Sequence, residues 1–457
     1  MVATMKINSE TSRIRAALVN SGRYSFVEAE RKLESLRLDI QIGSESAATL
    51  SGQAAALTAV VTASRCFLGG VTLTGAIDQP LILPLPLPAD TLGQAAILLG
   101  ATRRLSTQPS RVVVVGSQKF SDSVWSIRAI WNGWSAGIVP GNQSSSLVGR
   151  SDCALAGIAA GALAVCNAFS AEQNDPFAGE IIQGISLWEP DKREQWLNNN
   201  GPDEYYLPDA IWLVGLGNLG QAYLWNLSLL PYSDPTSLQL FFQDDDIVSE
   251  ENWGTSILVK RGNYGILKTR LAEEWAESRR FRSRRIDRRL DEHLRRISSE
   301  PNIAMAGLDK MSARRLLGRP GFDYIIDGGL GATAHDYRRF RLNVFDQSLD
   351  PASHFSGVLD ASESKVEDVL RLPAYREVEN TQHFDSCGMA ELAGQSVAVP
   401  FVSVFLASIA VTQAIRLASN QNFYRSITGD LNDLRSIRTV LGSISNRTTI
   451  GYTEMKH

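Results

Sequence analysis

Residues 210–220 read AIWLVGLGNLG, and this stretch decides the fold. The apolar run 211–215 ends at a glycine, and Gly215, Gly217 and Gly220 follow the spacing GxGxxG. A short apolar run that leads directly into such a turn and then into a helical stretch, 221–230, predicts a βα unit whose turn amides can hold phosphate. The motif alone leaves three interpretations open, namely a dinucleotide site, a mononucleotide site and a purely structural turn.

The chain beyond this turn continues as alternating strand and helix patterns. Apolar runs at 238–243, 303–307 and 324–327 alternate with helical stretches at 265–279 and 312–317. Such alternation predicts an α/β fold with a doubly wound, Rossmann-like and mostly parallel sheet. Ligands of these sheets bind beyond the carboxyl ends of the strands, so the residues that follow each strand are the candidates for function.

The length of 457 residues indicates two domains. A polar stretch with Pro, Gly and three consecutive Asn, 187–208, separates two apolar-rich regions. We therefore expect one α/β domain over 1–195 and a second over 205–457. In the first, 47–66, 91–103 and 154–169 are expected to be helices and 111–116 a strand. Gly116 is not followed by two further glycines, so the function of this half is not legible.

Composition restricts the class of protein. The formal charge of -4 does not favour binding of a bulk polyanion. The longest apolar stretches, 154–168 and 397–415, are interrupted by polar residues, Gly or Pro, and we expect core helices rather than membrane spans. The N-terminus lacks the apolar core of a secretory signal, so we expect a cytoplasmic protein without a membrane partner. Four cysteines without a CxxC pair argue against structural zinc.

An acidic cluster follows the predicted strand 238–243. The chain reads QDDDIVSEENWGTS, with Asp244 and Asp246 two residues apart and Asn252 eight residues after Asp244. A carboxylate at this strand end can accept the ribose hydroxyls of NAD or of ATP equally well. A solvated acidic turn is the plain alternative.

Two further residues separate ATP chemistry from NAD chemistry. Lys268, in the sequence GILK, begins a predicted helix, where its ammonium could neutralise charge on an α-phosphate. Asp309 follows the strand 303–307, where a carboxylate facing phosphates suits Mg²⁺. An NAD-dependent oxidoreductase has no use for either residue, although a surface lysine is the plain alternative for Lys268.

Together, these spaced elements resemble the adenylation core of the ThiF, MoeB and HesA family and of the ubiquitin-activating enzymes. The family order is GxGxxG, DxDxV with a later Asn, GxxK and DNxxxR, and the resemblance covers about 210–413. It implies that ATP and Mg²⁺ are bound, with Asp309 as the magnesium ligand. The implied nucleotide residues are Gly215, Gly217, Gly220, Asp244, Asp246, Asn252, Lys268 and Asp309.

The sequence departs from the family pattern at two positions. Thr255 stands where family members have an arginine, and Lys310 stands where they have an asparagine after the magnesium aspartate. Phosphate neutralisation is then expected from Lys260, from Arg261 or from an arginine of the N-terminal half. Arg23, in a polar segment expected to be helical, is the candidate there, because family dimers take an arginine from the partner subunit.

The resemblance also assigns a thiol. Family members have a crossover loop that leads to a cysteine and a long helix, and here a polar, irregular segment, about 354–387, ends at HFDSCG before the apolar stretch 397–415. Cys387 would accept the acyl group from the adenylate as a thioester, and His383 could assist. The other cysteines lie in apolar surroundings, as buried thiols do.

The resemblance further implies partners. These are a ubiquitin-like protein or a sulfur carrier of the ThiS or MoaD type, and a conjugating enzyme with its own catalytic cysteine. The lack of zinc cysteines and of appended domains favours a bacterial ubiquitin-like conjugation operon, a class linked to antiviral defence. By analogy, the N-terminal half would be a degenerate, inactive copy of the adenylation domain, and a homodimer is also compatible with the family.

Two rival classes stay open. An NAD-dependent oxidoreductase accounts for the glycines and Asp244. A nucleic-acid-binding module is suggested by nine arginines within 279–296. Because Asp287, Asp291 and Glu292 alternate with them, we expect a solvated β-edge or helix face rather than a nucleic-acid site, although the same basic surface could dock an acidic carrier protein.

Overall fold

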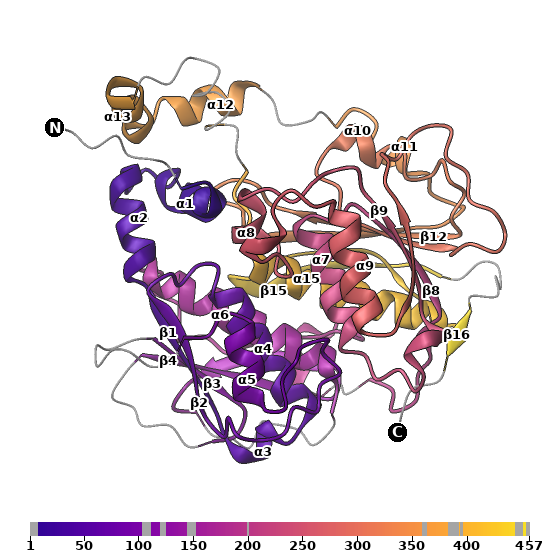
Figure 1. The fold of residues 1–457 in the computed structure, drawn as a ribbon, viewed down its shortest axis with the longest axis horizontal. Coiled ribbons are helices and arrows are strands. Elements are labelled where there is room, and N and C mark those ends of the chain that lie inside the picture. The colour runs from indigo at the N-terminus through magenta and orange to yellow at the C-terminus, as the bar shows by residue number, and fades with distance from the viewer. Residues whose placement is uncertain are drawn as a thin grey trace.

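A computed structural model gives the fold (Figure 1). It describes residues 8–102, 111–118, 125–143, 152–198, 201–358, 363–382, 393, 396–443 and 451–453. Two large β-sheets, one from each half of the chain, are packed together through helices, and β7 (Leu207–Pro208) pairs with β16 (Tyr452–Thr453) in a third, two-stranded sheet. The predicted doubly wound, mostly parallel α/β fold is confirmed.

The N-terminal sheet has the strand order β2-β1-β3-β4-β5-β6. Its strands are β1 (Arg37–Ile42), β2 (Gly70–Gly75), β3 (Arg111–Val115), β4 (Ser126–Asn132), β5 (Ser135–Pro140) and β6 (Gln183–Ser186). The first four in spatial order are parallel to one another. β5 is antiparallel to β4, and β6 is antiparallel to β5. Between and after these strands lie α4 (Leu50–Ala63), α5 (Leu92–Leu98) and α6 (Ala154–Glu172), and α3 (Ser44–Ala47) is a single turn.

The C-terminal sheet has the order β10-β9-β8-β11-β12-β13-β14-β15. Its strands are β8 (Ala210–Val214), β9 (Gln239–Gln243), β10 (Arg282–Ile286), β11 (Ile303–Ala306), β12 (Tyr324–Leu330), β13 (Arg339–Phe345), β14 (Tyr424–Asp430) and β15 (Asp433–Leu441). The first five in spatial order are parallel to one another. Each of the last three is antiparallel to the strand before it. The helices are α7 (Asn218–Ser228), α8 (Glu251–Thr255), α9 (Lys268–Ser278), α10 (Met311–Arg314) and α15 (Pro400–Ala418).

The two halves share one topology. The N-terminal order β2-β1-β3-β4-β5-β6 corresponds to β9-β8-β11-β12-β13-β14, and each pair of neighbours runs in the same relative direction in both sheets. A long helix precedes the last shared strand in each half, α6 before β6 and α15 before β14. By this correspondence β1 is the counterpart of β8, the strand that carries the glycine turn.

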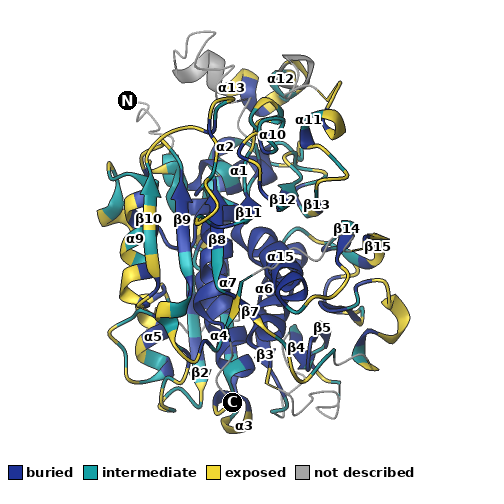
Figure 2. Cartoon of the chain, turned by 90° about the vertical axis from the view of Figure 1, so that its right-hand side faces the viewer, coloured by how far each residue is buried: buried dark blue, intermediate teal, exposed yellow. Residues whose placement is uncertain are grey.

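The long apolar helices form the layer between the sheets (Figure 2). α6 and α15 pack against each other, α6 also packs against α4, and α15 against α7. Both are long and apolar enough to cross a membrane, but both are completely buried in the fold, as expected for core helices. Gly157 and Gly161 allow close packing, because a Cβ at these positions would lie 2.0 Å and 2.3 Å from backbone oxygens of α4.

The N-terminal helices contact the segment before α15. α13 (Pro373–Gln382) packs against α1 (Ser12–Val19) and α2 (Phe26–Ser35). The ring of Tyr375 in α13 lies edge-on against Phe26, and its hydroxyl donates to Asn20 Oδ1 at 2.8 Å. The segment 354–387 was expected to be irregular, but its described part contains α12 (Glu363–Leu370) and α13. A second sequence expectation is also wrong, because Arg23 lies in the turn between α1 and α2 and not in a helix.

Candidate functional site

The glycine turn leaves open space at the N-terminus of α7. Gly220 must be glycine, because a Cβ there would lie 2.1 Å from the oxygen of Gly215. Gly215 has a positive φ of 82°, which favours glycine. A Cβ on Gly217 would meet nothing within 4 Å, and no side chain caps α7 at this residue. The first amides of α7 are therefore available to an anion.

Asp244 joins the acidic strand end to the glycine turn. Its Oδ2 accepts a hydrogen bond from the Leu216 amide at 2.6 Å, and its Oδ1 accepts one from the Asp246 amide at 2.8 Å. Burial raises the pKa of Asp244, and the nearby Lys268 ammonium acts in the opposite direction. The carboxylate thus fixes the position of the turn relative to the end of β9.

Lys268 lies against the same acidic strand end. Its Nζ is 2.7 Å from Asp246 Oδ2, and its side chain is only 10% exposed. A β-bridge between Ile247 and Leu267 brings the start of α9 to this place. The carboxylates of residues 244–246 lie within 4.8 Å of one another, so Lys268 neutralises part of a concentrated negative charge. The structure therefore brings together the glycine turn, Asp244, Asp246 and Lys268.

Asp309 borders the turn from the other side. It is exposed, and within the described part of the chain it has no hydrogen bond or ion pair. The preceding Gly307 is in contact with the turn, because its oxygen would lie 3.0 Å from a Cβ on Gly215. Asp309 thus follows a strand end that adjoins the glycine turn, with no protein partner for its carboxylate.

Arg314 braces this strand end and does not face solvent. Its guanidinium binds Asp327 Oδ2 at 2.8 Å and also donates to the carbonyl oxygens of Leu308 and Gly328. Both side chains of the ion pair are buried, at 7% and 0% exposure. Burial raises the pKa of Asp327 to about 6, and Arg314 lowers it.

Asn252 lies in α8, and its Oδ1 accepts from the Ser249 amide at 2.9 Å. No described contact joins it to the turn or to Lys268. Thr255, at the end of α8, is buried. One cation that contacts α8 is Arg13 of α1, whose Nη2 lies 3.1 Å from Glu251 and whose Nη1 donates to Ser396 Oγ at 3.1 Å.

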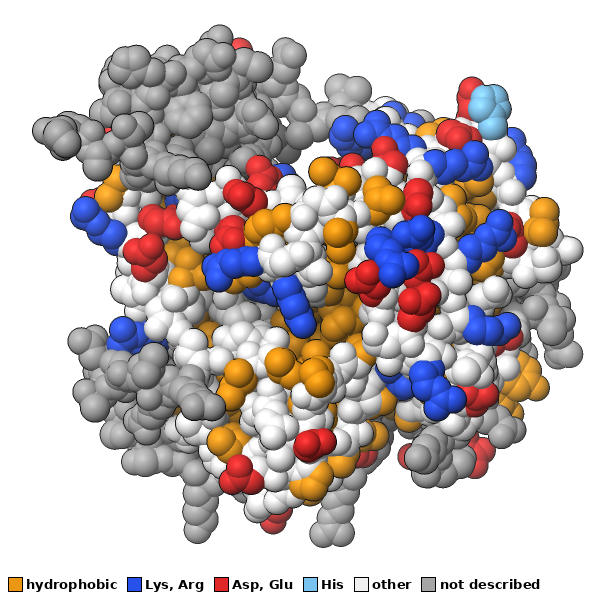
Figure 3. Space-filling model, viewed as in Figure 1, with side chains coloured by type: hydrophobic (Ala, Val, Ile, Leu, Met, Phe, Trp, Pro, Cys, Tyr) orange, Lys and Arg blue, Asp and Glu red, His pale blue; other side chains and the backbone are white. Residues whose placement is uncertain are grey.

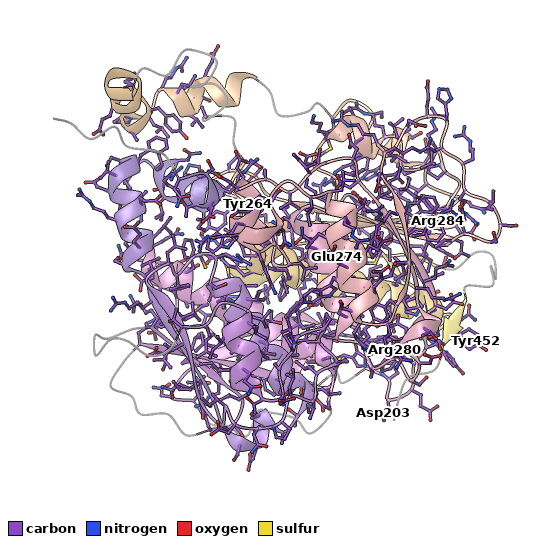
Figure 4. The ribbon with its side chains drawn as sticks, in the orientation of Figure 1. Asp203, Tyr264, Glu274, Arg280, Arg284 and Tyr452 are labelled. Atoms are coloured by element: carbon purple, nitrogen blue, oxygen red, sulfur yellow. The ribbon has the colours of Figure 1, made fainter. Side chains whose placement is uncertain are left out.

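The other arginine candidates have different contacts. Arg261 pairs with Glu10 at 2.9 Å and stacks on Trp253. Figure 4 shows Tyr264, which also donates to Glu10, beside α8. Arg23 is exposed and donates to the carbonyl oxygen of Gln173, after the end of α6. Lys260 is exposed next to Arg261.

Sequence reasoning missed one residue of the glycine turn and one residue that contacts α8. Asn218, inside the glycine motif, accepts a hydrogen bond from Ser403 at 2.5 Å, and its Nδ2 is buried without a partner among the described residues. Its place in GLGNLG was the available signal. Arg13 gave no signal, because it lies more than two hundred residues from α8 in the chain and only the fold brings the two together.

The cysteines are placed as follows. Cys66, Cys153 and Cys166 are free and buried, and burial raises the pKa of each thiol, to about 12 for Cys153 and Cys166. They are therefore unsuited to act as nucleophiles. Cys387 and His383 lie outside the described residues.

Comparison with known proteins identifies the family. The BilD N-terminal domain model matches residues 37–187, and the BilD C-terminal domain model matches residues 207–421. The bacterial E1-like protein BilD of Collimonas sp. (strain OK412) is 31% identical over 433 residues, which is 93% of either chain. This chain belongs to the BilD family of bacterial E1-like proteins.

Solved structures are more distant from this BilD-family chain. E. coli MccB, solved with MccA-N7isoASN, is 11% identical and matches 53% of this chain and 66% of its own, with a TM-score of 0.33. The E. coli tRNA N6-threonylcarbamoyladenosine dehydratase TcdA is 14% identical and matches 46% and 85%, with a TM-score of 0.28. At such low scores we draw no functional conclusion from either structure.

The Arg314–Asp327 pair predicts a stability effect. Arg314→Met should lower the free energy of unfolding by about 3–5 kcal/mol, because it leaves a buried carboxylate without its cation. Arg319→Met, at an exposed arginine nearby, should change it by less than about 0.5 kcal/mol. Denaturant unfolding measures both.

The pH dependence of this effect has a definite sign. In the native protein the pKa of Asp327 is about 6, above its ordinary value of 3.8, so its contribution to stability is lost as pH rises through about 6. Without Arg314 this pKa rises further, and the deficit of Arg314→Met should be larger above pH 6 than below it. An equal loss of stability above and below pH 6 would contradict this account of the ion pair.

Proposed function

We propose that this chain uses ATP to adenylate the C-terminal carboxylate of a ubiquitin-like protein and then holds that protein as a thioester on Cys387. The observation that carries the proposal is the convergence of the glycine turn, Asp244 and Lys268, in which Asp244 bonds the Leu216 amide and Lys268 bonds Asp246. An oxidoreductase would not need a lysine here. The membership in a family of bacterial E1-like proteins supports the same activity.

The residues present fit a nucleotide and its metal. The space over Gly217 and the uncapped start of α7 suit phosphate oxygens, and the unpartnered Nδ2 of Asn218 is a further donor near the turn. Asp309, without a protein partner, would hold Mg²⁺, which neutralises phosphate charge when bound. Asp244 would accept a ribose hydroxyl with the lone pairs that its two amide bonds leave free.

In the first step, a carboxylate oxygen of the ubiquitin-like protein attacks the α-phosphorus of ATP. The bond from that phosphorus to the bridging oxygen breaks, and pyrophosphate leaves with the electron pair. Lys268 is placed to stabilise the charge that develops on the α-phosphate oxygens, since its ammonium is held at the site by Asp246.

Arg13 would supply the positive charge that Thr255 cannot. The arginine comes from α1, reaches Glu251 in the first turn of α8 and also bonds Ser396, at the end of the segment that contains Cys387. Its contacts with exposed or partly exposed groups leave it able to turn toward a phosphate. Arg23 is directed at Gln173 instead.

In the second step, the Cys387 thiolate attacks the acyl carbon of the adenylate, AMP leaves, and the thiol proton passes to solvent. The thioester would then move to the cysteine of a conjugating enzyme, in a bacterial conjugation operon of the kind linked to antiviral defence. A sulfur carrier would share the first step and differ in the second. Cytoplasmic location and homodimer formation stay predictions.

The N-terminal half would be an inactive copy with a scaffold role. After β1, the counterpart of β8, the chain reads GSES instead of GLGNLG. Ser117 donates to the Glu45 carboxylate, and Ser46 Oγ lies only 1.8 Å from where a Cβ on Gly116 would be. Acidic and polar side chains of the N-terminal half thus occupy the place that corresponds to the proposed phosphate site of the C-terminal half.

Substitution of Lys268 tests the first step. Lys268→Ala should lower ATP–pyrophosphate exchange, measured with a candidate ubiquitin-like protein, by roughly 100-fold. Lys310→Ala, at the exposed lysine after Asp309, should have little effect. Nicotinamide absorbance changes in place of exchange would instead establish an oxidoreductase.

The assignment of Arg13 is tested against Arg23. Arg13→Ala should reduce exchange at least ~10-fold, because a charge near the phosphates is lost, whereas Arg23→Ala should leave it unchanged. Thermal unfolding of both variants controls for loss of the α1 contacts. The reverse ranking would assign the phosphate to Arg23.

Cys387 is tested by the fate of the acyl group. Cys387→Ala should still form the adenylate but no thiol-sensitive adduct with the ubiquitin-like protein, whereas Cys153→Ala should form both, since Cys153 is buried with a pKa of about 12. Gel electrophoresis with and without reductant measures the adduct. An adduct that survives Cys387→Ala removes this cysteine from the mechanism.

A further inference from the structure

β10 is an open edge of the C-terminal sheet. It is the first strand in the spatial order and pairs only with β9 among the described strands, and Figure 2 shows it at the margin of the molecule beside α9. The Arg282 amide and the Ile286 oxygen bond to the β9 side. Because bonding direction alternates along a strand, the backbone groups of Ser283 and Arg285 face outward, where a further strand could pair.

A concentration of arginine surrounds this edge. Residues 279–300 contain nine arginines against four carboxylates, although the whole chain has a formal charge of -4. Several of these arginines are neutralised, for example Arg284 by Glu300 and Arg289 by Asp245. Four exposed ones form no ion pair within the described part of the chain, namely Arg280, Arg282, Arg288 and Arg295.

The basic side chains follow the strand. Figure 4 shows Arg280 and Arg284 at different heights along this side of the molecule, and Figure 3 shows Lys and Arg side chains spread over the C-terminal half. We call the open strand together with its unpaired arginines, Arg280, Arg282, Arg288 and Arg295, the β10 arginine edge. Protection of an edge strand against aggregation explains charges on the strand itself. It does not explain Arg288 and Arg295, which lie beyond its end.

Arg280 occupies a conformation that favours glycine. Its φ is 64°, and it closes α9 in a Schellman arrangement, in which its own amide bonds Glu277 O and the Phe281 amide bonds Ala276 O. Glycine at this position would avoid the steric strain of the left-handed region. The backbone conformation therefore does not explain an arginine at this position. A role of its exposed guanidinium would explain it.

The loop after the strand is rigid and presents an apolar side chain. Asp291 accepts from the amides of His293 and Leu294, and Arg296 donates to Gly321 O. The backbone amide of Ile297 donates a hydrogen bond to the Glu300 carboxylate. The side chain of Ile297 is 62% exposed. Because these hydrogen bonds already order the loop, its side chains can contact a partner with little further loss of entropy.

We infer that the β10 arginine edge binds an acidic polypeptide segment, which adds to β10 as an extended strand with its carboxylates on the unpaired arginines. A protein partner fits better than nucleic acid. Arginine forks bind carboxylates and phosphates alike, so the preference for a protein rests on the outward backbone groups of β10, which pair with another polypeptide backbone. The inference is independent of the adenylation site.

The test uses the full-length protein without ATP and a short synthetic peptide that alternates Glu and Val. Fluorescence anisotropy should show binding that the Lys–Val peptide lacks and that a Glu peptide with two prolines, unable to pair as a strand, largely loses. Arg282→Glu combined with Arg288→Glu should weaken binding at least ~10-fold. The matched control is Arg31→Glu with Arg438→Glu, at two exposed arginines elsewhere, one of them on the opposite edge strand β15.

Arg280→Gly excludes unfolding as the cause. It should leave thermal stability equal or higher, because glycine relieves the left-handed strain, yet weaken peptide binding by ~3-fold. The absence of binding by the unaltered protein overturns the inference, as does equal weakening by the control pair. Equal affinity for the proline peptide would rule out strand addition. Tighter binding of oligothymidylate, lost in the same variants, would make this a nucleic-acid surface instead.

Discussion

The packing of α6 against α15 is the contact on which the rest of the structure depends. Each helix covers its own sheet, and exposure of either would bring a long, mainly apolar surface into water, since nearly all of its residues are buried in the fold. The two halves therefore form one apolar core that runs through both helices. Glycines on α6 bring α4 close enough for backbone contact, and Trp225 of α7 donates to Thr58 of α4 across the junction. The N-terminal half is thus part of the support of the site.

Within this support, the site is organised by charge. Three consecutive aspartates at one strand end would repel one another, and their arrangement is balanced by the turn amide on Asp244, by Arg289 on Asp245 and by Lys268 on Asp246. Partial neutralisation leaves a locally negative edge beside an uncapped helix N-terminus. A phosphate group would favour the helix end and a cation the carboxylates, so a metal-bound nucleotide suits both.

Much of the C-terminal fold could be predicted from sequence, because its central parallel strands are buried on both faces and appear as apolar runs, such as IWLV and IAMA. β1 was not predicted, because its sequence RLDIQI alternates polar and apolar residues and contains no continuous apolar run. The contacts of Arg13, and the helices α12 and α13, could not be read either, because tertiary packing determines them. Arg23 was misassigned because α1 ends at Val19 and Gly22, with its positive φ, belongs to the turn that follows. The glycine turn, Asp244 and Lys268 were found from local motifs alone, whereas no local pattern showed that Asp244 bonds Leu216.

Comparison of the two sheets shows where the C-terminal half has gained structure. Six strands are shared, and β10 and β15 are additions at opposite edges of the C-terminal sheet. β15 and its turn meet β6, where Gln183 bonds Leu431 O and the Leu434 amide, so this addition joins the halves. β10 pairs with β9 and packs against α9, and among the described strands it has no neighbour on its other side. Protection of the open edge accounts for the arginines on the strand itself but not for Arg288 and Arg295 beyond its end, and the N-terminal sheet has no counterpart of β10. The addition at the open edge is therefore better explained by contact with another molecule than by the stability of this one.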